Sequence, residues 1–90
     1  MAKIAKHDME LVSDGRLFLT HLIMEKGMKH TSISRAIGNS NTSKVRDGHI
    51  GPKAFIRMFK HYHNNYFEWC KDNSKTPDER VTTYINELYG

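Results

Sequence analysis

Residues 31–48 read TSISRAIGNSNTSKVRDG, and this stretch decides the fold. Its first half predicts a short helix over 30–37 that ends at Gly38, because glycine adopts the left-handed backbone conformation that closes helices at little cost. Its second half predicts a polar, basic helix over 40–47, in which Val45 is the one plainly apolar residue. Two short helices joined by a tight turn, the second with almost nothing to bury, indicate a helix-turn-helix. In the first of them the expected inward side chains are Ile33, Ala36 and Ile37. Ser32, Ser34 and Arg35 are expected to face outward or toward the turn.

Apolar residues at helical spacing predict an earlier helix between residues 8 and 26. Asp8 or Ser13 could cap its start, and Gly15 would weaken a continuous helix. Two helical pieces and a single helix from Ser13 are therefore both open. Gly27 is expected to end the helix. Its apolar face is expected to contain Leu11, Val12, Leu17, Phe18, Leu19, Leu22, Ile23 and Met24.

Two further helices are expected in the second half of the chain. One runs from Pro52, a residue favoured in the first helical turn, to about residue 63, where Asn64-Asn65 interrupts the pattern. The last begins at a capping box formed by Thr76 and Glu79. Their apolar stripes are Ala54, Phe55, Met58, Phe59 and Tyr62 in the former and Val81, Tyr84, Ile85 and Leu88 in the latter.

An aromatic patch, Tyr-Phe-Glu-Trp-Cys at 66–70, separates these two helices. Aromatic side chains with basic neighbours can stack on the bases of single strands. Here Lys71 is the one adjacent basic residue, so packing in the core or at a dimer surface is the favoured interpretation.

Length and composition limit the class of protein. Ninety residues predict one small domain, 1–90. The single Cys70 excludes an internal disulfide and fits a reducing compartment. No apolar run approaches the ~20 residues that a membrane span needs, and the start does not resemble a signal peptide. We therefore expect no membrane partner and a cytoplasmic location, in a bacterium or a phage-infected host cell.

The charge is unevenly distributed along the chain. Residues 1–65 hold eleven Lys/Arg and five acids, net +6, whereas residues 66–90 hold three and five, net −2. A basic front with an acidic tail favours a polyanion as partner, although ordinary surface charge also fits. Residues 1–7 are expected to form a flexible basic arm.

The order of these features resembles a known family. Its pattern is followed by six parts of the chain, namely Leu17, Leu22 and Ile23, then Gly27-Met28, the run from Ile33 to Gly38, the segment 39–46, Asp47-Gly48 and the run from Pro52 to Phe59. Over 14–63 the chain resembles the Cro and C1-type (lambda-repressor-like) helix-turn-helix family. The resemblance implies an all-α, compact bundle of about five short helices containing a helix-turn-helix, here with an extra C-terminal helix. It also implies double-stranded DNA as partner, with the helix after the turn in the major groove.

The side chains around that helix suit DNA recognition. Asparagine can pair with adenine, arginine or lysine with guanine, and serine or threonine with either base or phosphate. The expected base contacts are Asn41, Thr42, Ser43 and Arg46, and the expected phosphate contacts are Arg35, Ser40, Lys44, Lys53 and Arg57. A solvated loop rich in turn residues is the alternative interpretation of the same run.

The expected function is a sequence-specific, repressor-like transcriptional regulator that binds a palindromic site as a homodimer. The segment 66–90 offers the dimer surface, through Tyr66, Phe67, Trp69, Tyr84, Ile85 and Leu88. The alternative is a small phage-type protein-binding module that inhibits a host factor, and an RNA-binding protein is a third possibility.

Catalytic and metal chemistry find no support in the sequence. No catalytic grouping, phosphate-binding glycine loop or pair of carboxylates is present, so we expect neither an enzyme nor a cofactor. His61, His63 and Cys70 lack the spacing of a zinc site, so we also expect no metal.

Overall fold

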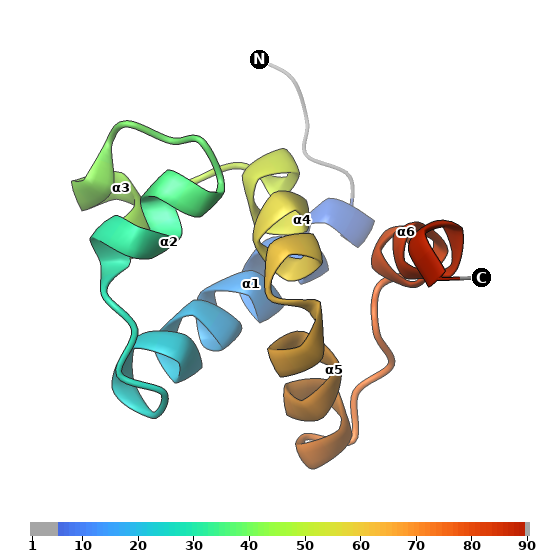
Figure 1. Cartoon of the computed structure of the whole chain (residues 1–90). Helices are drawn as coiled ribbons and strands as arrows, with labels where there is room; N and C mark the ends of the chain where they lie inside the picture. Colours follow the sequence, from blue (N-terminus) through green and yellow to red (C-terminus); the bar gives the residue numbers. More distant parts are fainter. Residues whose placement is uncertain (1–5, 90) are drawn as a thin grey trace.

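A computed structural model describes residues 6–89, which form six α-helices and no strand (Figure 1). This arrangement confirms the predicted all-α bundle with an extra C-terminal helix. The helices are α1 (Lys6–Met24), α2 (His30–Ala36), α3 (Thr42–Asp47), α4 (Pro52–His61), α5 (His63–Asp72) and α6 (Glu79–Tyr89). Because α1 begins at Lys6, the end of the predicted basic arm is helical, and residues 1–5 lie outside the described part of the chain.

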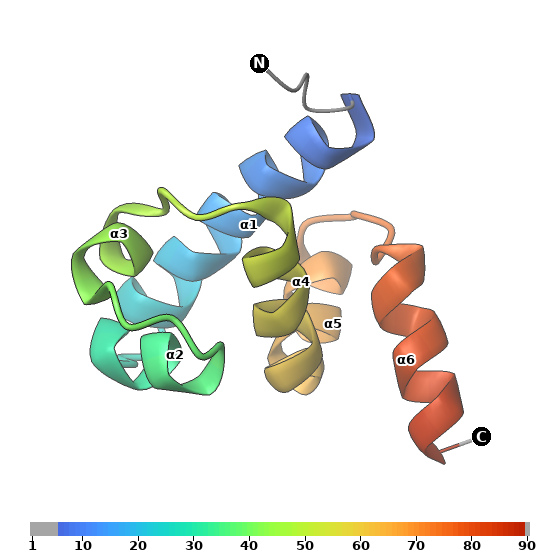
Figure 2. The same ribbon diagram turned by 90° about the horizontal axis from the view of Figure 1, so that it is seen from above.

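The helix α4 occupies the middle of the molecule, and it packs against α1, α2, α5 and α6. Figure 2 shows α2 and α3 together at one end of the bundle and α6 at the other, with α4 between them. The amphipathic stripe predicted for α4 is confirmed, since Phe55, Met58 and Phe59 are almost fully buried. The helix-turn-helix pair therefore stands on a scaffold made by α1 and α4.

The helix α1 is continuous from Lys6, so neither of the two open predictions is correct. One was a helix in two pieces, and the other was a single helix that begins near Ser13. Gly15 lies inside the helix, where a Cβ atom would stand 2.4 Å from Cδ1 of Phe55. The glycine is thus a point of close approach between α1 and α4, and the packing outweighs its poor helix propensity. The expected burial of Leu17 and Met24 is also wrong, because they are 55% and 76% exposed.

The helices α4 and α5 meet at Tyr62, and Asn64-Asn65 lies inside α5, so the predicted interruption there is wrong. Tyr62 itself departs from helical geometry, with φ −105° and ψ 40°. The break turns α5 so that Tyr66 stacks on the ring of Phe59, with ring centroids 4.2 Å apart. Trp69 likewise packs on Phe18 at 5.6 Å. The aromatic patch is therefore part of the core, which confirms the favoured interpretation.

The helix α6 begins three residues later than the capping box predicted. Asp78 precedes the helix, and its Oδ1 accepts a hydrogen bond from the Arg80 backbone N–H at 2.9 Å. The Asp78 N–H in turn donates to the Tyr66 hydroxyl at 2.9 Å. Burial raises the pKa of Tyr66 well above its ordinary value, so this hydroxyl stays protonated at neutral pH. The local Asp78 cap and the contact with Tyr66 on α5 together mark the start of α6.

None of the helices within residues 6–89 combines the length and the apolar character needed to cross a membrane.

Candidate nucleic-acid interface

The turn between α2 and α3 is held by its own polar side chains. Gly38 adopts φ +70°, as its position at the end of the first helix predicted. The Ser34 hydroxyl donates to the Asn39 carbonyl oxygen, and Asn39 Oδ1 accepts from the Asn41 N–H at 2.9 Å. Ser34 is 1% exposed, so of its two expected positions, outward or toward the turn, the structure shows the second. Its hydroxyl satisfies a carbonyl in the turn, which explains a buried serine on α2.

Two arginines from other helices fasten this unit at its ends. Arg16 on α1 donates from Nε to the Gly48 carbonyl oxygen at 3.0 Å, next to the C-terminus of α3. Arg57 on α4 donates to the Ile37 carbonyl oxygen at 3.2 Å, at the C-terminus of α2. Val45 is fully buried and anchors the underside of α3. The short α3 is therefore held rigidly although it buries a single side chain.

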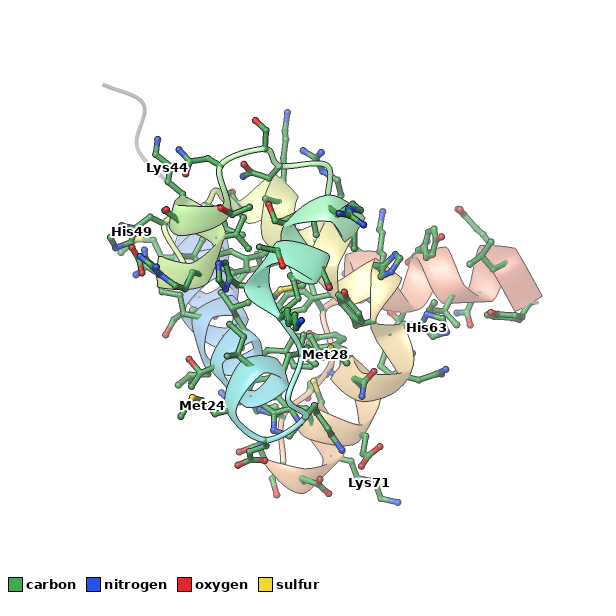
Figure 3. The ribbon with its side chains drawn as sticks, turned by 60° about the vertical axis from the view of Figure 1, so that its left-hand side comes forward. Met24, Met28, Lys44, His49, His63 and Lys71 are labelled. Carbon is green, nitrogen blue, oxygen red and sulfur yellow. The ribbon has the colours of Figure 1, made fainter. Side chains whose placement is uncertain are left out.

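The buried position of Val45 determines which side chains of α3 face outward. Successive residues of an α-helix are rotated by ~100°, so Ser43 and Asp47 lie opposite Val45, with Lys44 and Arg46 on either side. All four of these outer residues are exposed. Figure 3 shows Lys44 projecting from the molecular surface. The outer face of α3 thus presents a hydroxyl, two cations and one carboxylate.

The surface around α3 is strongly basic. Residues 26–67 contain eight Lys/Arg and one acid, Asp47. Arg46 Nε donates to Asp47 Oδ1 at 3.1 Å, and this hydrogen bond is the main cause that lowers the pKa of the carboxyl group. The charges of Arg46, His49 and His30 lower it further. Asp47 therefore stays ionised at neutral pH and holds the Arg46 guanidinium in position.

The base-contact candidates have different positions in the structure. Ser43 and Arg46 are exposed on α3, and Thr42 is half-buried on the side of Val45. Asn41 is exposed, but its Oδ1 caps α3 by accepting from the Lys44 N–H at 3.2 Å. A bidentate pair with adenine needs the same oxygen, so the structure favours a capping role for Asn41.

The phosphate-contact candidates share one property, since all of them are exposed. They come from three parts of the helix-turn-helix region, namely α2, the turn with α3, and the first half of α4. These residues are Arg35, Ser40, Lys44, Lys53 and Arg57.

Two residues of this region were not among the sequence-based candidates. The role of Arg16 has no local signal, because its partner Gly48 lies 32 residues away. Asp47 did carry a signal, as the single acid between residues 26 and 67.

The six dimerisation candidates are not all at the surface. Tyr66 and Trp69 are 4% and 6% exposed and belong to the core of the chain, which removes them as contacts for a second copy. Leu88 is 54% exposed near the end of α6. The half-buried candidates are Phe67, Tyr84 and Ile85.

The histidines and the cysteine lie in separate environments. The His63 ring packs near Phe67, whereas Cys70 is buried in the core, where burial raises the pKa of its thiol. Within residues 6–89, no group of three or more His, Cys, Asp or Glu side chains is arranged to hold a metal ion.

The cap of α3 gives a first prediction. Replacing Asn41 with alanine should lower the free energy of unfolding by about 1 kcal/mol, because the Lys44 N–H loses its acceptor. For a domain of this size the midpoint of thermal unfolding should fall by about 4–8 °C. Asn41→Asp keeps an acceptor oxygen and should retain stability, and Ser40→Ala at the exposed neighbour is the control. Equal stability of Asn41→Ala and Ser40→Ala would contradict the capping role.

The chain has no match among protein-family models, curated proteins or solved structures.

Proposed function

We propose that this protein is a sequence-specific, double-stranded-DNA-binding transcriptional regulator of the repressor type, and not an enzyme. The observation that carries the proposal is the state of α3, which is firmly anchored yet buries one side chain. Asn41 caps the start of α3, and Arg16 holds the Gly48 carbonyl oxygen just after its end, so its exposed polar face is ready to bind a surface. The surrounding cations favour a polyanion as that surface.

The proposed contacts follow from the outer face of α3. Placed in the major groove, Arg46 reads a guanine and Asp47 holds its guanidinium, while Ser43 meets a neighbouring base edge. Lys44 contacts phosphate, together with Arg35 on one side and Lys53 on the other. Of the four expected base contacts this assignment keeps Ser43 and Arg46, and it leaves out Asn41, which caps α3, and the half-buried Thr42.

A single α3 of six residues covers few base pairs, so the proposal includes a homodimer on a palindromic site. The exposed Leu88, with the half-buried Tyr84 and Ile85, is the part of the proposed dimer surface that remains accessible. A DNA-binding role of this kind also implies a cytoplasmic location in a bacterial or phage-infected cell.

The salt dependence of duplex binding tests the proposal. Four cations on phosphates, Arg35, Lys44, Lys53 and Arg57, predict that log K falls with log salt with a slope of about −3.6 per bound chain, at about −0.9 per contact. The measurement is fluorescence anisotropy of a labelled duplex at several salt concentrations. No duplex binding at low salt would overturn the proposal and favour the protein-binding alternative. Stronger binding to an RNA duplex than to DNA would instead favour an RNA-binding protein.

A further inference from the structure

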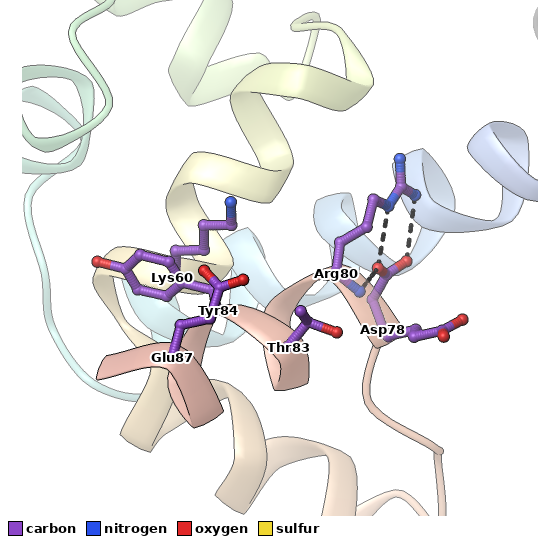
Figure 4. Close-up of a pocket in the computed structure, with 7 residues that line it drawn as sticks. Lys60, Asp78, Arg80, Thr83, Tyr84 and Glu87 are labelled. Carbon is purple, nitrogen blue, oxygen red and sulfur yellow. Dashed lines mark hydrogen bonds and ion pairs between the residues drawn. The ribbon is translucent and has the colours of Figure 1, made fainter. Parts of the chain in front are cut away.

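Two pockets adjoin each other along the junction of α4 and α6, and they share Lys60 and Arg80. The first, of about 550 Å³, opens between Lys60 and the exposed side of α6 and is the one drawn in Figure 4. The second, of about 420 Å³, lies nearer the start of α4, and we name it the α4 pocket. Its floor is formed by Pro52 and Ile56.

The two pockets differ in charge. The first is lined by Lys60 and Arg80 against three acids, Asp78, Glu79 and Glu87, for a net charge of −1. The α4 pocket has four cations against one acid in its lining, and because Arg80 is also paired with Asp78 the net charge including that carboxylate is +2. Its charged side chains are Lys53, Arg57, Lys60, Arg80 and Asp8. An anionic ligand is therefore favoured in the α4 pocket and disfavoured next to it.

The cations of the α4 pocket are held in place by neighbours. Arg80 donates from Nε and NH2 to the two carboxylate oxygens of Asp78 at 3.1 and 3.2 Å, and Figure 4 shows this fork. Its NH1 lies 3.4 Å from Asp8 Oδ1. Lys60 Nζ lies 4.9 Å from the centre of the Tyr84 ring. Cations fixed before binding lose little entropy when a ligand arrives, which favours affinity.

The α4 pocket also adjoins the helix-turn-helix. Arg57 lines the pocket and, through NH1, holds the Ile37 carbonyl oxygen at the end of α2. Lys53 belongs to both the pocket and the proposed phosphate contacts of the DNA site. Lys60 and Arg80 extend the same basic surface away from α3, from α4 onto α6.

We propose that the α4 pocket binds a phosphate group together with the sugar attached to it. Lys53, Arg57 and Lys60 match the phosphate, and the apolar lining residues Pro52 and Ile56 match a deoxyribose. The volume exceeds that of a lone phosphate and lies in the range of small-ligand pockets. The source of this group is the backbone of a bound duplex outside the α3 contacts, an assignment that rests on the proposed function. A free nucleotide presents the same chemistry.

Matched lysine variants and a titration test this proposal. Lys60→Gln removes one cation of the α4 pocket, whereas Lys71→Gln removes an equal charge on α5, outside both pockets. We expect Lys60→Gln to reduce the steepness of the salt dependence of duplex binding by about 0.9 and Lys71→Gln to leave it unchanged. In parallel, backbone amide NMR of the full chain follows Ile56, Lys60 and Arg80 during addition of duplex, of deoxyadenosine monophosphate and of inorganic phosphate. Amide shifts of these residues on addition of duplex identify the DNA backbone as the source of the phosphate group in the pocket.

Saturable shifts with the monophosphate or with phosphate, but not with duplex, support the pocket and assign a free phosphate compound as its ligand. The absence of shifts with all three additions, with Lys60→Gln behaving as Lys71→Gln does, would overturn the proposal. Because the small-molecule titrations do not depend on α3, failure of the DNA-binding proposal and failure of the pocket are distinguishable. Since Lys60 also contacts Tyr84, the spectrum of Lys60→Gln serves as the check that α6 remains docked.

Discussion

The double substitution Lys44→Gln and Arg46→Gln is expected to weaken duplex binding at least about tenfold at moderate salt. Each cation that leaves a phosphate reduces the steepness of the salt dependence by about 0.9, and a lost arginine–guanine pair removes about 1–3 kcal/mol of base discrimination. Both side chains are exposed, so the midpoint of thermal unfolding should stay within a few degrees of the original. Fluorescence anisotropy on specific and scrambled duplexes measures both effects.

The control is a protein in which Lys26 and Lys71 are changed to glutamine. These residues are exposed and lie outside the helix-turn-helix, and the net charge falls by the same two units. If the control loses as much affinity as the Lys44/Arg46 variant, binding depends on total charge and α3 has no special role. Retention of sequence preference in the Lys44/Arg46 variant would contradict the assignment of Arg46.

The second large effect is expected at Gly15. Alanine is favoured over glycine by about 1 kcal/mol in a helix, so propensity alone predicts that Gly15→Ala stabilises α1. The new Cβ would lie 2.4 Å from Cδ1 and 2.6 Å from Cγ of Phe55, a fully buried ring. Overpacking typically costs about 1–3 kcal/mol, and an approach of 2.4 Å to a buried ring places this change at the upper end of the range. We therefore expect a net loss of about 2 kcal/mol and a fall of about 8–16 °C in the unfolding midpoint.

Three further variants isolate the contact, namely Ser13→Ala, Phe55→Leu and the combination of Gly15→Ala with Phe55→Leu. Ser13→Ala lies on the exposed side of the same helix and should change stability by less than about 0.5 kcal/mol, since it alters propensity alone. Adding Phe55→Leu to Gly15→Ala frees space at the crossing, so the double variant should lose less than the two single losses combined. Thermal unfolding followed by circular dichroism compares the original protein with the four variants, Gly15→Ala, Ser13→Ala, Phe55→Leu and the double variant. A Gly15→Ala protein more stable than the original would mean that α1 and α4 do not approach as closely as described.

The parts of the fold that the sequence predicts correctly depend on local chemistry. Gly38 ends α2 in the left-handed conformation, and Pro52 occupies the first turn of α4. The stripe from Phe55 to Phe59 is buried as its periodicity indicates. Each of these features needs no knowledge of distant residues.

The errors come from contacts between residues that are distant in the sequence. The helix α1 continues through Gly15 because the Phe55 ring packs directly against this position, forty residues further along the chain. The start of α6 moves from Thr76 to just after Asp78, whose N–H the Tyr66 hydroxyl binds. Leu17 is 55% exposed although it lies on the apolar side of α1. Periodicity shows that a helix has an apolar side but not how much of that side a partner covers.

The candidate site follows the same division. The exposed positions of Ser43, Lys44 and Arg46 agree with a polar helix that has little to bury. The capping role of Asn41 was a local feature that the sequence left open, because asparagine suits both a cap and an adenine contact. The support from Arg16 comes from a different helix, so no pattern around Gly48 indicates it.

The most direct test of the central claim, that α3 reads the bases of double-stranded DNA, is selection of bound sequences from a random duplex library. The account predicts an enriched palindrome whose half-sites lose their preference in the Lys44/Arg46 variant and keep it in the Lys26/Lys71 control. The half-site spacing would also show whether two copies bind together. A library that remains random after repeated rounds at low salt would contradict the claim.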